Sequence, residues 1–437
     1  MALALLLNGA LLAVLLPWLR RQWRAAGMAG RVALLVGLGG RLLVGGVRGW
    51  RPVHDAGYMS HYGHLLTAQA WVHPADAWRT LWGNELHFAG QSLVFHGMSN
   101  TFFLVKVLAF LNLASLDENW LNALYLAVFS FVGCWCLAQS LRRAFPHTPS
   151  AAVIVAFVAW PSVVLWATGI SKEAVLLGSG AGLLAIFIEF FYWVPTLGTT
   201  RNVRWWLVMS GVLLALLHFN IRYFFALPLL GVLVGLGFVR LLQQMGLAQR
   251  RWAQLWAFGA VLSAGVWLGT ALGPAFGLNK LTNQVVRVYD HHVGTSADKP
   301  HFAYPDLQPT GKSLLRHAPL AAANALTRPW LGESRQLLYL AAGFENLVLL
   351  ALSSLAIWAI WRGRAGKLPF GLVLALGVHC LALAVLLGLT TPNLGSLHRY
   401  RTGLLPYLLL LLLQNDYAAA GLRRLGLGDA SGGTPHP

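Results

Sequence analysis

Apolar stretches long enough to cross a lipid bilayer recur along nearly the whole of this 437-residue chain. A helix needs about 20 mostly apolar residues to cross the hydrocarbon core of a bilayer, and we predict eleven such helices. Their ranges are 2–19, 31–48, 120–141, 150–168, 173–193, 205–220, 223–242, 254–273, 336–361, 369–390 and 402–415. Only 11% of the residues are charged, whereas soluble domains carry roughly 25%. The sequence therefore predicts an all-α, polytopic transmembrane helix bundle, formed by a single integral membrane domain over residues 1–437.

Positive charge is concentrated in short segments between the predicted spans. The chain contains 32 Lys and Arg but only 14 Asp and Glu, an excess that would suggest nucleic acid in a soluble protein. In membrane proteins, however, Lys and Arg gather in short cytoplasmic loops, so we expect the lipid bilayer, and no nucleic acid, as a partner. If the spans alternate, one side receives the basic clusters at 20–24, 142–143, 201–204, 250–251, 362–367 and 423–424. That side is expected to be cytoplasmic, together with the tail 416–437, and the N-terminus is expected outside.

Three segments then lie outside the membrane, at 49–119, 274–335 and 391–401. The first is expected to carry short interfacial helices, and so is the second, which is long and polar enough to form a lid over a cavity. The stretch 101–116 is apolar but short, and it contains Lys106. If it crossed the membrane, every later loop would change sides and the agreement with the basic clusters would be lost. We therefore interpret it as an interfacial or re-entrant segment.

Carboxylates are so few that their positions indicate where acid–base chemistry can occur. On the predicted topology only Asp416 and Asp429 are cytoplasmic, while Glu189 and Glu345 fall within spans. The remaining ten of the 14 acids lie outside or at the outer boundary. A site that uses a carboxylate should therefore face the exterior. A cytoplasmic ATP-driven enzyme is disfavoured, because the chain has no GxxxxGK[ST] phosphate-binding loop.

Asp55 is the first candidate among the external acids. It follows the second predicted span, in a segment where a proline and a glycine interrupt the helix. A carboxylate in this place could accept a proton from the hydroxyl or amine of an acceptor, with His54 and Tyr58 as supporting neighbours. The alternative is a loop acid that pairs with Arg48 or Arg51.

The pair Lys172 and Glu173 is the second candidate. It opens the predicted span 173–193, directly after an expected external turn that contains Gly169. An acid near a helix N-terminus is favoured by the helix dipole, so the pair could simply cap the turn. A charged pair at a tight turn of so charge-poor a protein could equally bind a polar headgroup. Both interpretations stay open.

External arginines form the third candidate group. They are Arg222, Arg328, Arg399 and Arg401, with His398 and Tyr400 as supporting residues. The planar guanidinium group matches the oxygens of a phosphate, so several of them converging at one membrane face would bind a lipid phosphate. For any single arginine, the alternative is an interfacial anchor beside tryptophan and tyrosine.

Two groups of histidines raise the question of a metal site. They are His54, His61 and His64 around Asp55, and His291 and His292 after Asp290. Neither group forms an HExxH or comparable metal-binding pattern. We therefore expect no cofactor and assign no metal ligands, although a divalent metal is left open.

Several short motifs together resemble the GT-C superfamily of polytopic glycosyltransferases, most closely bacterial members grouped with glycosyltransferase family 39 and the protein mannosyltransferases. The motifs are Arg41-Leu42 followed by Asp55 and Tyr58, Pro161-Ser162 to Lys172-Glu173, Asn220-Ile221-Arg222-Tyr223, Arg328-Pro329-Trp330 with Glu333, Glu345-Asn346, and Asn393-Leu394-Gly395 to Arg399-Tyr400-Arg401. They are spread over most of the chain. Ala56 follows Asp55, where many relatives carry a second acid.

The resemblance implies a transferase of the bacterial inner membrane whose active site faces the periplasm. It would move a hexosyl or pentosyl group from a polyprenyl-phosphate-linked sugar to a glycan or lipid acceptor, with inversion at the anomeric carbon. The resemblance makes Asp55 the base that activates the acceptor. It assigns the donor phosphate to Arg222, Arg399, Arg401, Lys172 and Arg328.

Two other functions remain open. A glycan polymerase or ligase of the O-antigen type would join whole lipid-linked oligosaccharides, and it would depend on Arg399 and Arg401 more than on Asp55. A lipid or solute transporter would be expected to show inverted repeats and polar residues along its spans. No repeat is visible, and the few charged residues inside spans include Arg41, which we expect to snorkel toward the interface, as we expect of Lys106.

Overall fold

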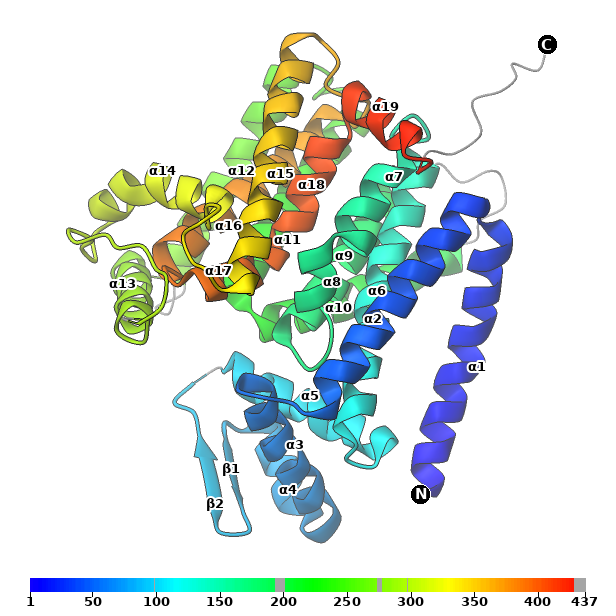
Figure 1. Ribbon diagram of the computed structural model, residues 1–437, viewed down its shortest axis with the longest axis vertical. Coiled ribbons are helices and arrows are strands. Elements are labelled where there is room, and N and C mark those ends of the chain that lie inside the picture. Colours follow the sequence, from blue (N-terminus) through cyan, green and yellow to red (C-terminus); the bar gives the residue numbers. More distant parts are fainter. Residues whose placement is uncertain (98, 193–200, 273–276, 297, 428–437) are drawn as a thin grey trace.

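Long helices form most of the molecule. The computed structural model describes residues 1–97, 99–192, 201–272, 277–296 and 298–427. Within these residues, eight helices are long and apolar enough to cross a membrane. They are α1 (Ala2–Ala25), α2 (Met28–Trp50), α6 (Asn119–Ala144), α9 (Lys172–Phe191), α11 (Tyr223–Gln244), α12 (Arg251–Leu272), α15 (Leu337–Trp361) and α16 (Phe370–Thr390). The expected multi-pass, all-α membrane bundle is thereby confirmed (Figure 1).

The other three predicted spans are shorter or interrupted. The stretch 150–168 is divided into α7 (Ser150–Val153), the π-helical turn η1 (Ile154–Ala159) and α8 (Pro161–Trp166), and the stretch 402–415 into η3 (Arg401–Gly403) and α18 (Leu405–Leu413). The third lies in α10 (Arg201–Ile221), whose apolar part is Trp205–Ile221. The exact number of crossings therefore stays a prediction.

Arg41 compensates for the break between η1 and α8. Pro161 has no backbone N–H, so it cannot donate to the carbonyl four residues earlier, that of Phe157. The fully buried Arg41 reaches across from α2 instead, donating to the carbonyl oxygens of Phe157 and Val158 at 2.7 Å each. The expectation that Arg41 snorkels was wrong, because this side chain satisfies backbone groups inside the bundle.

The segment predicted to be the first external loop folds into a small lobe at one end of the bundle (Figure 1). It contains α3 (Asp55–Val72), α4 (Pro74–Trp82), β1 (Glu85–Phe88), β2 (Gln91–Val94) and α5 (Asn100–Ser115). The antiparallel hairpin was not predicted, because its turn residues Ala89 and Gly90, both with positive φ, lack the usual Asn-Gly or Asp-Gly signal. Lys106 of α5 donates to the carbonyl oxygen of Gly83 at 2.7 Å. The interfacial or re-entrant position of α5 stays a prediction.

A second region that is predicted to be external lies between α12 and α15. It contains α13 (Leu278–Gly294) and α14 (Gly311–Thr327), and after α16 follows the short α17 (Leu394–Tyr400). Asn393 ties the two parts together, because its side chain donates to Ser296 Oγ at 3.0 Å and accepts from the backbone N of Ser396 at 2.9 Å. The last described helix, α19 (Asp416–Arg424), lies at the opposite end of the bundle from α3 and α4 (Figure 1).

Close packing of α6 and α9 fixes the position of the α9 N-terminus. A Cβ on Gly133 would lie only 2.1 Å from the carbonyl oxygen of Gly178, so the two backbones are in direct contact. Small residues allow such contact between membrane helices, where packing rather than water exclusion drives association. The first residues of α9 are therefore rigidly placed, and they carry the centre of the candidate site.

Candidate functional site

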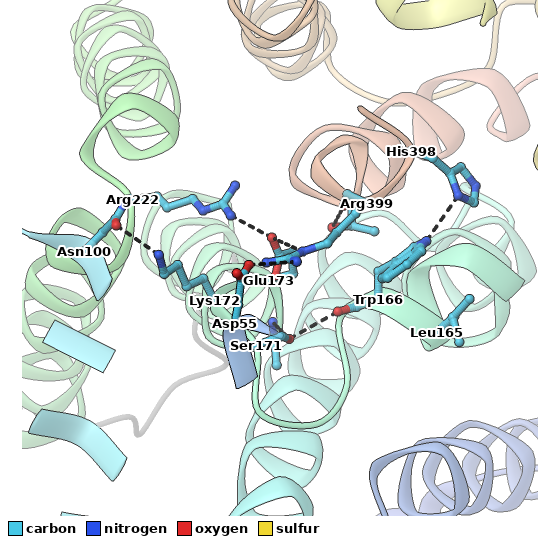
Figure 2. A network of polar contacts seen from close by, with 12 residues as sticks. Asp55, Asn100, Leu165, Trp166, Ser171, Lys172, Glu173, Arg222, His398 and Arg399 are labelled. Atoms are coloured by element: carbon cyan, nitrogen blue, oxygen red, sulfur yellow. Dashed lines mark hydrogen bonds and ion pairs between the residues drawn. The ribbon is translucent and has the colours of Figure 1, made fainter. Parts of the chain in front are cut away.

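Charged residues from four separate parts of the chain meet at one place, as Figure 2 shows. Asp55 is the first residue of α3, while Lys172 and Glu173 open α9. Arg222 separates α10 from α11, and Arg399 lies on α17. Each of them sits at a helix end or on a short helix, where the chain changes direction. The structure thus brings together five of the residues that the sequence indicated.

A chain of alternating charges runs through this site. Arg222 Nη2 lies 2.7 Å from Glu173 Oε1, and Arg399 Nε lies 3.1 Å from the same oxygen. Arg399 Nη1 then lies 3.2 Å from Asp55 Oδ2. Burial alone would lower the pKa of Arg399, but the adjacent Glu173 carboxylate outweighs it and raises that pKa above its ordinary value. Asp55, at the solvent end of the chain with 64% of its side chain exposed, is free to meet a second reactant.

Lys172 is the one cation of the cluster that has no carboxylate within ion-pair distance among the described residues. Its Nζ donates to Thr101 Oγ1 at 2.7 Å and to Asn100 Oδ1 at 3.0 Å, both neutral acceptors at the start of α5. Ser171 fixes this turn, because its hydroxyl donates to the Trp166 carbonyl and accepts from the backbone N of Ala174, each at 3.2 Å. Lys172 therefore adds uncompensated positive charge.

An open cavity of about 630 Å³ adjoins the cluster. Lys172 and Arg222 line it, and so do Asn100, Thr101 and Tyr400. The guanidinium carbon of Arg222 lies 4.1 Å from the centre of the Tyr400 ring, a cation–π contact that orients the arginine. A cavity of this size with a few convergent polar groups is typical of small-molecule sites, and this one offers two cations to an anion.

A second polar network anchors α17 through His398. His398 accepts a hydrogen bond from Trp166 Nε1 at 3.2 Å, and its Nε2 lies 3.5 Å from Glu345 Oε2. Trp160 and Ser162 both donate to the other carboxylate oxygen of Glu345. The short helix that carries Arg399 is thereby anchored to α8 and α15. Sequence patterns indicated His398 and the 160–173 region, but not their connection through Glu345.

Arg328 and Arg401 lie in a different environment. Arg401 is 1% exposed, and its Nη1 donates to the carbonyl oxygen of Arg328 at 2.9 Å and to Asn346 Oδ1 at 2.7 Å. Arg328 Nε lies 3.1 Å from Glu333 Oε1. Neither arginine lines the cavity. Their predicted role as phosphate ligands gains no support from this placement, which is that of structural cross-links.

Arg401→Met is expected to destabilise the protein by about 1–3 kcal/mol, because it leaves the buried acceptors on Arg328 and Asn346 without a donor. Burial also lowers the pKa of Arg401 to about 10, in keeping with a side chain removed from solvent. Thermal unfolding in detergent would measure the loss. The expected binding of phosphate, measured below the unfolding temperature, should stay unchanged, and its loss would return Arg401 to the predicted phosphate ligands.

The remaining predicted residues lie around Asp55. His54 precedes α3 with a positive φ of 52°, and the Tyr58 ring is tilted by 58° against that of Tyr62, with centroids 4.9 Å apart. Arg48 does not pair with Asp55; it donates to the carbonyl of Thr168 at 3.0 Å and to that of Leu165. No group of three or more metal-binding side chains comes together among the residues that the structure describes.

Comparison with known proteins does not add to this picture. No protein-family model, curated protein or solved structure matches the chain. The resemblance to GT-C glycosyltransferases therefore stays an inference from short motifs, and the function has to be argued from the site.

Proposed function

We propose that this protein is a membrane glycosyltransferase that moves a sugar from a polyprenyl-phosphate donor to an acceptor on the outer side of a bacterial inner membrane. The observation that carries the proposal is the convergence of Asp55, Arg399, Glu173, Arg222 and Lys172 beside one cavity. The cations at one end of this charge chain can bind an anion, and the carboxylate at the other end is exposed. Transfer from a phosphate-linked donor uses both.

The cations have the role of holding the donor phosphate. Lys172 and Arg222 reach the cavity from α9 and from the α10–α11 break. Both donate charge-assisted hydrogen bonds, which are about twice as strong as neutral ones. The apolar side chains of Phe224, Leu386 and Leu387 line the same cavity. A prenyl chain would thus stay among apolar groups while its phosphate meets the cations.

Asp55 has the role of the general base. It would take the proton from an acceptor hydroxyl, whose oxygen forms a bond to the anomeric carbon as the bond from that carbon to the phosphate oxygen breaks. The leaving polyprenyl phosphate keeps the electron pair, and the cations stabilise its added charge. A single displacement of this kind inverts the anomeric carbon.

Lys172→Met is expected to weaken the binding of undecaprenyl phosphate about 10- to 100-fold, because one hydrogen bond to a charged group contributes about 1.5–3 kcal/mol. Binding would be measured with the full chain in lipid nanodiscs. Lys280→Met, at an exposed position of α13 outside the cavity lining, is the matched control and should bind as the unchanged protein does. Equal affinity of both variants, or no binding by the unchanged protein, would contradict the proposal.

A further inference from the structure

The cavity has two walls of different chemistry. The wall formed by α5, α9 and the α10–α11 break carries Lys172 and Arg222. The wall formed by α13 carries the polar side chains of Gln284, His291 and His292 but no lysine, arginine or acid. Among the described residues that line the cavity, no acid and no further lysine or arginine occurs. Binding of the donor phosphate therefore explains the side chains of only one wall.

One face of α13 is turned to this cavity. Gln284, Val288, His291 and His292 all line it, and their spacing of four, seven and eight residues places them on one side of a helix. Charged residues of the same helix, such as Lys280 and Asp290, are absent from the lining. The helix thus presents a neutral hydrogen-bonding face, although it carries charge elsewhere.

These side chains match the hydrogen-bonding pattern of hydroxyl groups. Burial, and the adjacent His291, lower the pKa of His292, so its ring is uncharged at neutral pH. A neutral imidazole has one donor and one acceptor nitrogen, as a hydroxyl group both donates and accepts. The Gln284 carbonyl oxygen is taken by Arg287, which leaves its NH₂ group as a donor.

Aromatic rings complete the surroundings. Tyr223, Phe224 and Tyr400 line the same cavity, and the first two are tilted against each other with ring centroids 4.0 Å apart. Flat apolar surfaces beside neutral donors and acceptors suit a sugar ring, which has apolar C–H faces and a rim of hydroxyl groups.

We propose that the α13 wall is the subsite for the sugar of the donor, and that His291, His292 and Gln284 select a neutral, hydroxyl-rich ring. This inference rests on the proposed function. No lysine, arginine or acid lines this wall, and Arg287, which contacts it, is hydrogen-bonded to Gln284. Uronic acids and amino sugars are therefore disfavoured.

The test compares donor lipids with and without a sugar. The full chain in nanodiscs is titrated with undecaprenyl phosphate, and with undecaprenyl phosphates that carry glucose, mannose, galactose, arabinose or glucuronic acid. The unchanged protein should bind at least one neutral glycolipid about tenfold or more tightly than the bare lipid, and the glucuronic acid lipid no more tightly than the bare lipid. Two hydrogen bonds of ordinary strength supply that difference.

Variants then assign the preference to α13. His292→Ala and His291→Ala should reduce the preference for the neutral sugar about tenfold while leaving affinity for the bare lipid unchanged, and His292→Gln, which keeps a donor and an acceptor, should recover part of it. Lys172→Met should weaken the binding of the bare lipid and of the glycosylated lipid equally. His87→Ala, on the exposed hairpin, should change neither the affinity for the bare lipid nor the preference for the neutral sugar.

The possible failures are distinct. The sugar subsite is wrong, and the phosphate site stands, if the unchanged protein binds bare and glycosylated lipids equally. The same holds if the histidine variants keep the preference for the neutral sugar, or if they weaken the binding of both lipids alike. If no polyprenyl phosphate binds, the proposed function falls, and this inference with it.

Discussion

Asp55→Asn is expected to lower the rate of sugar transfer by about 10²- to 10⁴-fold, the usual contribution of a general base. The amide has almost the same shape as the carboxylate and can still lie at the start of α3, but it cannot take the acceptor proton. Because Asp55 does not line the cavity that holds the phosphate-binding cations, affinity for undecaprenyl phosphate should change little. The measurement is transfer from a labelled donor lipid by protein reconstituted in liposomes.

Asp76→Asn is the matched control for this experiment. Asp76 is another exposed acid of the first external loop, paired only with the neighbouring Arg79 at 3.4 Å. Exposed pairs of this kind contribute about 0–1 kcal/mol, so the variant should transfer at the normal rate. A fully active Asp55→Asn variant would show that another group takes the proton, and the assignment of Asp55 would be lost.

Glu173→Gln is expected to destabilise the protein by about 3–5 kcal/mol, because it removes the carboxylate from a buried ion pair. Among the described residues, it leaves Arg222 without a carboxylate partner and Arg399 with Asp55 alone. Glu173 is 1% exposed and its partner Arg222 8%. Both Arg222 and Arg399 contact the same oxygen, Oε1, so one substitution affects two cations. The free energy of unfolding would be followed by titration with a denaturing detergent.

A second variant separates lost charge balance from lost packing. Glu173→Gln combined with Arg222→Met also removes the cation that Glu173 balanced, and this double variant should be more stable than Glu173→Gln alone. Glu85→Gln, at an exposed acid of the hairpin, should change stability by no more than about 0.5 kcal/mol. If the double variant were as unstable as the single one, Glu173 would act through shape and not through its charge.

Much of the site could be predicted from sequence, because its residues stand where apolar spans end. The turn before Lys172 and the break at Arg222 both separate long apolar runs, and both exist in the structure. In a chain with only 14 acids, Asp55 was also easily recognised. What sequence could not provide was the partner of each charge, since those contacts join residues far apart in the chain, from 49 positions for Glu173 and Arg222 to 344 for Asp55 and Arg399.

The arginines of 399–401 illustrate a second limit. Arg399 and Arg401 are two residues apart, and a phosphate-binding pattern predicted the same role for both. The short α17 and the η3 turn direct Arg399 toward Glu173 and Asp55, and Arg401 toward Asn346. Such short helices carry no apolar periodicity from which the direction of a side chain could be read. The wall of α13 was missed for a similar reason, because only the folded chain shows which face of that helix meets the cavity.

Asn393 links the segment after α13 to the start of α17. One side chain holds the segment after α13 through Ser296 and the first turn of α17 through Ser396. The position of the α13 wall and the direction of the short helix that carries Arg399 are therefore coupled through a single amide group.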